Sequence, residues 1–122
     1  MPDADAASTV LVVDDEPSIR LLCRINLELE GFTVLEAGTL AEARGALDAN
    51  EVAAVLLDMR IGRESGGDLI DELRARRPPV PVALVTGSAE LVGDSGARAD
   101  AALRKPFTID QLIQTVKALL SR

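Results

Sequence analysis

The sequence contains no histidine, tryptophan or tyrosine, and it has one cysteine and two phenylalanines among 122 residues. Without histidine the chain can build neither a His-based metal site nor a Ser-His-Asp triad, and it can carry no phosphohistidine. Cys23 has no partner for an internal disulfide, which fits a reducing cytoplasm. No segment resembles a signal peptide, and the longest apolar runs, such as AAVLL at residues 53–57, have the length of strands. We therefore expect a cytoplasmic protein with no membrane partner.

A surplus of basic residues is also lacking. The chain has 13 Lys and Arg against 20 Asp and Glu, a formal net charge of −7 and a pI near 4.5. Nucleic acids and anionic membranes select basic surfaces, so we expect no nucleic-acid partner either. Apolar residues make up 48% of the chain, enough for one hydrophobic core. The sequence predicts a flexible leader over residues 1–8 and a single domain over residues 9–122.

Short apolar runs alternate with segments of helical periodicity. The runs predict strands at residues 9–14, 32–36, 53–58, 81–86 and 100–104. The apolar positions of the helical segments predict four buried faces: Ile19, Leu22, Cys23 and Leu29; Leu40, Ala43 and Leu47; Leu69, Ile70 and Leu73; and Ile109, Leu112, Ile113, Val116 and Leu120. Glycines 93 and 96 predict a short or irregular helix before residue 100. The alternation predicts a doubly wound α/β fold with a five-stranded parallel sheet.

Polar residues follow four of the five predicted strands. The first strand ends in Asp14 and Asp15, the third in Asp58, the fourth in Thr86, and the fifth runs into Lys105. Because the carboxyl ends of parallel strands lie at one edge of a sheet, we expect these side chains to meet there. The second strand ends in the sequence LEA, to which we assign no role.

This set of residues indicates phosphoryl chemistry. Three clustered carboxylates attract a hard divalent cation, and Mg²⁺ is the expected occupant. A cation alone requires neither Thr86 nor Lys105, whereas a phosphoryl group bound to that cation would use both. Asp58 is the predicted nucleophile, because carboxylates form aspartyl phosphates and the chain offers no histidine. Taken singly, each residue has an ordinary structural explanation such as helix capping or a surface charge. Their common register at one sheet edge favours the site.

The sequence resembles the receiver domain of bacterial two-component response regulators. The matching segments are VLVVDDE, VLLDMRIGRESGGDLI, LVTG and LRKPF, in the family's order, and the resemblance extends from Thr9 to the last helix. It implies a flavodoxin-like fold with strand order 2-1-3-4-5. It also implies a signalling switch that is not an enzyme.

The resemblance also implies a role for each site residue. Asp58 would accept the phosphoryl group, which Thr86 and Lys105 would bind. The bond between Lys105 and Pro106 would be cis. Mg²⁺ would be held by the side chains of three residues and by one backbone carbonyl: Asp14, Asp15, Asp58 and, through its carbonyl, Arg60.

The sequence departs from the family pattern at three places. Gly62 stands where the family usually has proline, four residues after the acceptor, and Ala102 stands where it usually has an aromatic switch residue. The segment between Thr86 and Lys105 is also a few residues shorter than usual. We therefore expect output without an aromatic rotamer change, carried by partial ordering of residues 88–99.

Several functions remain open on the sequence alone. In the first, a histidine kinase or histidine phosphotransfer protein phosphorylates the domain, which then binds an unidentified downstream protein as a monomer or weak dimer. In the second, a degenerate receiver binds proteins without phosphorylation. A phosphatase of the haloacid dehalogenase type is disfavoured, because Arg60 stands where a second acid is needed. A dinucleotide-binding domain is excluded, because no G-x-G-x-x-G follows the first strand. The chain is expected to be a stand-alone regulator or a receiver excised from a hybrid kinase.

Overall fold

The computed structural model describes residues 8–87 and 99–121. In chain order, its helices and strands are β1 (Thr9–Val13), α1 (Pro17–Leu29), β2 (Thr33–Ala37), α2 (Leu40–Ala49), β3 (Ala54–Asp58), β4 (Arg60–Ile61), β5 (Glu64–Ser65), α3 (Gly67–Ala75), β6 (Val82–Thr86), β7 (Ala101–Arg104) and α5 (Ile109–Leu120). The five predicted strands are present, each within one residue of its predicted bounds.

Five strands form one parallel sheet in the order β2-β1-β3-β6-β7, with β3 at its centre. Numbered by the main-sheet strands alone, this is the order 2-1-3-4-5, so the fold prediction is confirmed. The order reverses direction between β1 and β3, which is where ligands bind in open sheets of this kind.

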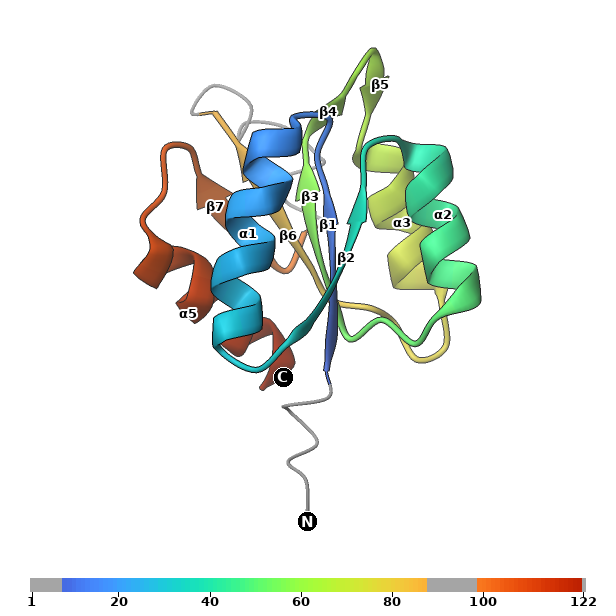
Figure 1. Ribbon diagram of the computed structural model, residues 1–122. Coiled ribbons are helices and arrows are strands. Elements are labelled where there is room, and N and C mark those ends of the chain that lie inside the picture. The colour runs from blue at the N-terminus through green and yellow to red at the C-terminus, as the bar shows by residue number, and fades with distance from the viewer. Residues whose placement is uncertain (1–7, 88–98, 122) are drawn as a thin grey trace.

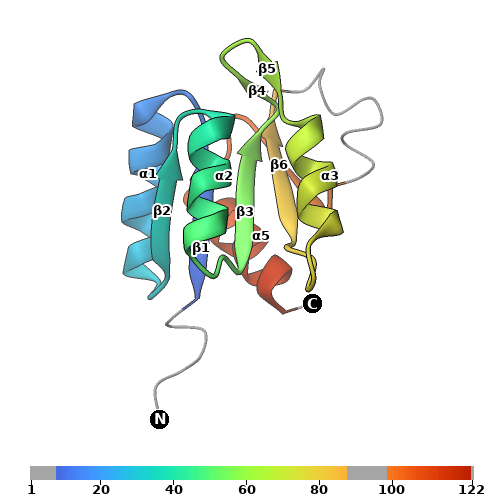
Figure 2. The ribbon, with the colours of Figure 1, turned by 90° about the vertical axis from the view of Figure 1, so that its right-hand side faces the viewer.

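Helices cover both faces of the sheet (Figures 1 and 2). Helices α1 and α5 lie on one face, and α2 and α3 lie on the other. Alternate residues of β1 enter the two resulting cores: Val10 and Val12 pack with the first pair of helices, Leu11 and Val13 with the second. This two-sided burial explains why the strands lack polar alternation.

Three helices begin at residues that favour a helix N-terminus. Pro17 occupies the first turn of α1, where a missing N–H costs nothing. Thr39 caps α2 by accepting the backbone N–H of Glu42. Thr108 and Gln111 form a reciprocal capping box at the start of α5.

The predicted buried face of α1 is partly wrong. Cys23 is buried, but Leu22 is 39% exposed and Leu29 is 78% exposed, while the unpredicted Leu27 is fully buried. Positions 19, 23 and 27 form a stripe at i, i+4 and i+8 that faces the sheet. Helix α1 carries a second apolar stripe, and periodicity alone cannot choose between two stripes on one helix.

Strands β4 and β5 were not predicted. They form a two-stranded antiparallel hairpin that pairs Arg60 with Ser65 and Ile61 with Glu64. Gly62 at its turn has φ +62°, a left-handed conformation that glycine adopts without strain. The hairpin places the segment after Asp58 above the end of the sheet (Figure 2).

Three predictions fall outside the described residues, apart from Ser8 and Ala99. They are the short fourth helix and the ordering segment, which lie before residue 100, and the leader at residues 1–8. All three stay predictions. Among the described residues, no helix is long and apolar enough to cross a membrane.

Candidate functional site

The structure brings the predicted side chains together at the carboxyl edge of the sheet. Asp14 follows β1 directly, Asp58 is the last residue of β3, Thr86 is the last residue of β6, and Lys105 follows β7. These strand ends are neighbours because β1, β3, β6 and β7 are adjacent in the sheet.

Three carboxylates form the acidic part of the site. One oxygen from each of Asp14, Asp15 and Asp58 lies within 4.8 Å of the others. Asp14 is 2% exposed and its Oδ1 accepts the backbone N–H of Glu16 at 2.9 Å, so its orientation is fixed by the turn into α1. Asp15 is exposed, and Asp58 is intermediate between the two.

Lys105 links two of these carboxylates. Its Nζ donates to Oδ2 of Asp14 and to Oδ2 of Asp58, each at 3.3 Å. Its backbone N–H donates to the carbonyl of Thr86 at 2.8 Å, which fixes the lysine beside the end of β6. The bond between Lys105 and Pro106 is cis, as expected from the resemblance.

The charges of the site change the pKa of two groups. Burial, followed by the charge of Asp14, raises the pKa of Asp58 above its ordinary value, although Lys105 opposes the rise. Burial alone would lower the pKa of Lys105, but Asp14 and Asp58 outweigh it, so the pKa of the ammonium is raised. Lys105 therefore stays charged near neutral pH and offsets part of the acidic cluster.

The other two predicted residues lie beside this cluster. Thr86 is fully buried, and its hydroxyl donates to the carbonyl of Gly87 at 3.1 Å. The backbone N–H of Arg60 donates to Oδ1 of Asp58 at 3.3 Å, and its side chain is exposed in β4. All residues predicted for the site therefore lie at the carboxyl edge of the sheet.

The donor set fits Mg²⁺. This cation takes oxygen ligands at about 2.1 Å and needs only a few carboxylates from the protein, since it keeps several waters. Three carboxylate oxygens that lie within 4.8 Å of one another can contact one such cation once the side chains move towards it. Such a cation would relieve the repulsion by Asp14, which adds to burial in raising the pKa of Asp58.

Sequence reasoning missed two features of the segment after Asp58, a hydrogen bond and a close backbone approach. The backbone N–H of Gly62 donates to Oδ2 of Asp15 at 2.9 Å, a bond that a proline at this position could not make. A Cβ on Gly66 would lie 3.0 Å from the side chain of Leu57 and 3.1 Å from the carbonyl of Asp58. The sequence offered one indication of the hydrogen bond to Asp15, because glycine rather than the family's usual proline stands at position 62.

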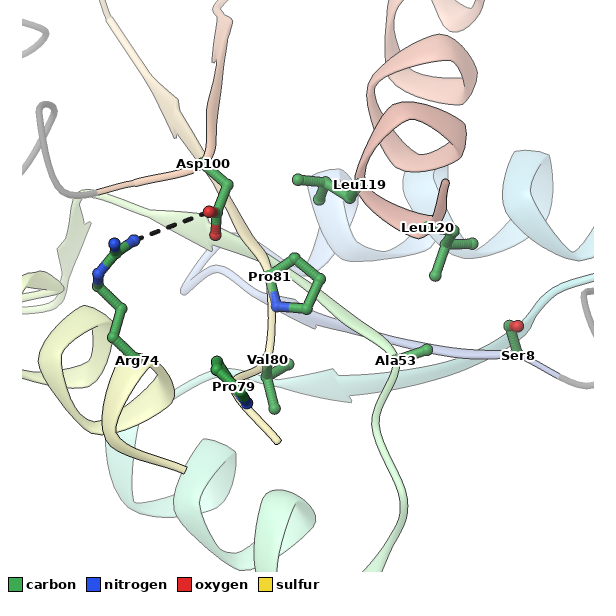
Figure 3. A pocket seen from close by; sticks show the side chains of 9 residues that line it. All are labelled: Ser8, Ala53, Arg74, Pro79, Val80, Pro81, Asp100, Leu119 and Leu120. Carbon is green, nitrogen blue, oxygen red and sulfur yellow. Dashed lines mark ion pairs between the residues drawn. The ribbon is translucent and has the colours of Figure 1, made fainter. Parts of the chain in front are cut away.

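A second hollow lies at the opposite edge of the sheet (Figure 3). Its volume is about 550 Å³, and its lining includes the residues just before four strands: Ser8, Ala53, Pro81 and Asp100. Arg74 and Asp100 form an ion pair across part of it at 3.7 Å. Because it opens at the amino ends of the strands, it is separate from the acidic site.

The protein is a doubly wound domain. It has an acidic cluster where the strand order reverses, and a lysine lies beside that cluster. The family model described as "Response regulator receiver domain" matches residues 10–117, so the chain belongs to that family. Receiver domains are components of two-component systems, and the recognition from motifs is confirmed.

Curated relatives support the assignment. The chain is 33% identical over 117 residues to the probable transcriptional regulatory protein TcrX of Mycobacterium tuberculosis, covering 93% of this chain and 50% of that protein. It is 34% identical over 125 residues to the sensor kinase CckA of Brucella abortus, covering 98% of this chain and 13% of the kinase. The chain thus spans half or less of these two relatives.

Solved structures show the same fold. One is the response regulator TrrA of Thermotoga maritima in complex with Mg²⁺ and BeF, with a TM-score of 0.83 and 32% identity over 93% of this chain and 99% of that one. Another is the receiver domain of NtrX from Brucella abortus, with a TM-score of 0.83 and 32% identity over 92% and 98% of the two chains.

Proposed function

We propose that this domain is a phosphoacceptor switch. A histidine kinase or histidine phosphotransfer protein supplies a phosphoryl group to Asp58, and the modified domain binds a downstream protein differently. The observation that carries the proposal is the placement of Lys105 at 3.3 Å from both Asp14 and Asp58, within a three-carboxylate cluster. A phosphoryl group joined to a cation would use all of these residues.

The transfer is a displacement at phosphorus. An oxygen of Asp58 forms the new P–O bond, the P–N bond to the donor's imidazole breaks, and its electron pair remains on the imidazole nitrogen. Lys105 keeps its proton and lies beside the phosphoryl oxygens, and the hydroxyl of Thr86 turns from Gly87 to donate to one of them. Mg²⁺, when bound, neutralises charge on the phosphoryl oxygens. Its ligands would be the cluster carboxylates and one carbonyl: Asp14, Asp15, Asp58 and the backbone of Arg60.

The proposal extends to where the domain works, its oligomeric state and its output surface. The domain works in the cytoplasm as a monomer or weak dimer and uses one phosphoryl group per switching event, without turning over a free substrate. The output surface lies around β7 and α5, where a hollow of about 510 Å³ is lined by Ala102 and Thr115 among others. Ala102 has no side-chain torsion to switch, so the change is carried by backbone ordering.

The test is phosphorylation by a small donor, followed by intact mass spectrometry. With acetyl phosphate or phosphoramidate and Mg²⁺, wild-type protein should gain one phosphoryl mass, and excess chelator should prevent it. Asp58→Asn should gain none, while the control Asp110→Asn, in the exposed first turn of α5, should react like wild type. Modification of Asp58→Asn would refute the acceptor assignment. An unreactive wild type would favour the phosphorylation-independent binding module.

A further inference from the structure

Glu36 lies near the end of strand β2, to which the sequence assigned no role. Its carboxylate accepts hydrogen bonds from two arginines of α1. Nε of Arg20 donates to Oε1 of Glu36 at 3.2 Å, and Nη1 of Arg24 donates to Oε2 at 2.6 Å. Each oxygen of Glu36 thus has its own charged partner, which fixes the plane of the carboxylate. The side chains of Arg20 and Glu36 are 19% and 25% exposed, so water competes weakly for this pair.

Arg20 also reaches the acidic site through a second nitrogen. Its Nη1 donates to the backbone carbonyl of Asp14 at 2.6 Å. That carbonyl belongs to the peptide unit that joins Asp14 to Asp15. The orientation of this unit sets the direction in which the chain leaves Asp14, and hence where the Asp15 carboxylate lies.

The sheet does not fix this peptide unit. The N–H of Asp14 still donates to the carbonyl of Ala37 at 3.0 Å, but this is the last bond between the two strands before the chain turns into α1. A backbone carbonyl at such a position needs a donor from elsewhere. Arg20 supplies it, and Glu36 prevents the guanidinium from turning away.

We infer that Arg20 is a positioning residue for the metal site, held by Glu36 and fixing the peptide between Asp14 and Asp15. The inference rests on the proposed function, because it concerns the residues that would bind Mg²⁺ there. Groups that orient metal ligands from behind typically change metal affinity by about 10- to 100-fold when removed.

Gly38 provides the space for this arrangement. A Cβ at Gly38 would lie 3.0 Å from Nη1 of Arg20, closer than ordinary contacts. Gly38 does not have a left-handed φ, so alanine is compatible with its backbone. Gly38→Ala therefore displaces the guanidinium without changing any charge.

A positioning role and a simple charge effect predict opposite results. If Arg20 acted only as a cation near the acids, its removal would strengthen Mg²⁺ binding, because the local potential would become more negative. If it positions the ligands, its removal weakens binding despite that gain. Gly38→Ala isolates the positioning contribution.

The experiment is calorimetric titration with Mg²⁺ alone, on wild type and four variants. Arg20→Ala, Glu36→Gln and Gly38→Ala should each weaken Mg²⁺ binding, by about tenfold for Arg20→Ala. Arg24→Ala is the matched control, because it removes the same charge but leaves the bonds from Arg20 to Glu36 and to Asp14 in place. Its affinity should stay within about twofold of wild type. Melting midpoints in chelator separate weaker binding from lower stability.

Three outcomes overturn the inference. One is tighter binding by Arg20→Ala together with unchanged binding by Gly38→Ala, which would show a charge effect only. Another is an equal loss in Arg24→Ala, which would show a general effect of helix α1. The third is loss of binding that only matches the loss of folded protein. Absence of Mg²⁺ binding by wild type would instead overturn the metal site itself, a result distinct from all three.

Discussion

Lys105 and Asp58 lie 47 positions apart in the sequence, and their side chains meet at 3.3 Å. The lysine also pairs with Asp14 at the same distance, so one ammonium serves two of the three carboxylates of the cluster. Without a cation the cluster keeps a surplus of negative charge, and the charge of Asp14 adds to burial in raising the pKa of Asp58.

Mg²⁺ should therefore stabilise the protein, and removing one acid should do so in its absence. Asp15→Asn is the better variant, because Asp15 is exposed, whereas Asp14 is buried and bonded to Glu16 and Lys105. We expect a rise in the unfolding free energy of about 0.5 kcal/mol in chelator. Thermal melts check it: the wild-type midpoint should rise with millimolar Mg²⁺ and that of Asp15→Asn should rise much less. A wild-type midpoint indifferent to Mg²⁺ would count against the site.

Gly62 should resist replacement by the family's usual proline. Its φ of +62° and its N–H bond to Asp15 are both lost with proline, whose φ is fixed near −65°. Gly62→Ala keeps the N–H but adds strain of about 1 kcal/mol, and Gly62→Pro should cost more. The control is Gly45→Ala inside α2, where an added Cβ meets nothing within 4 Å and should stabilise by about 0.5–1 kcal/mol. Urea unfolding decides, and equal stability of Gly62→Pro and wild type would contradict the assigned bond.

The two apolar stripes of α1 should differ sharply in mutational cost. Ile25 is 50% exposed, so Ile25→Ser should change the unfolding free energy by no more than about 0.5 kcal/mol. Leu27 is fully buried, and Leu27→Ala should cost about 2–5 kcal/mol. Denaturant titration of both variants measures this, and comparable losses would mean that both stripes are covered.

This helix shows how far sequence reasoning reaches. The strands and the site were predictable, because buried parallel strands are continuous apolar runs and their carboxyl ends must meet. The choice between Leu22 and Leu27 was not, because both complete an apolar stripe and only the packed neighbour decides. The contact of Glu36 with Arg20 was also hidden, since it joins residues 16 positions apart through side chains alone.

Cys23 should make the stability fall at alkaline pH. Burial above all, and then Asp14, raises the pKa of the Cys23 thiol to about 12. In the unfolded chain the thiol ionises near its ordinary value of about 8.5, so above that pH the unfolded state loses a proton that the folded state keeps. The stabilisation is complete below the unfolded pKa and is lost as the pH rises towards 12. From pH 7 to 10, the unfolding free energy of wild type should therefore fall by about 1 kcal/mol or more relative to that of Cys23→Ala. Urea unfolding at each pH measures it, and a constant difference would refute the assignment.

Arg60 should slow the loss of the phosphoryl group from Asp58. Its side chain is exposed in β4, while its backbone N–H is bonded to Asp58, so the guanidinium can lie across the acceptor and obstruct water. Arg60→Ala keeps the carbonyl proposed to bind Mg²⁺, and it should dephosphorylate faster at equal Mg²⁺ and pH. Decay of the phosphorylated mass after removal of the donor gives the rate. A slower decay would mean that Arg60 assists hydrolysis, as an arginine finger does.

The cavity at the amino ends of the strands shows where the polypeptide enters and leaves the fold. Ser8, just before β1, and Leu120, at the end of α5, line that same cavity, whereas Asp58 lies at the other edge of the sheet. A tether at either terminus therefore leaves Asp58, the proposed acceptor, open to a partner. Reporter fusions or surface immobilisation through both termini should accordingly be compatible with phosphotransfer.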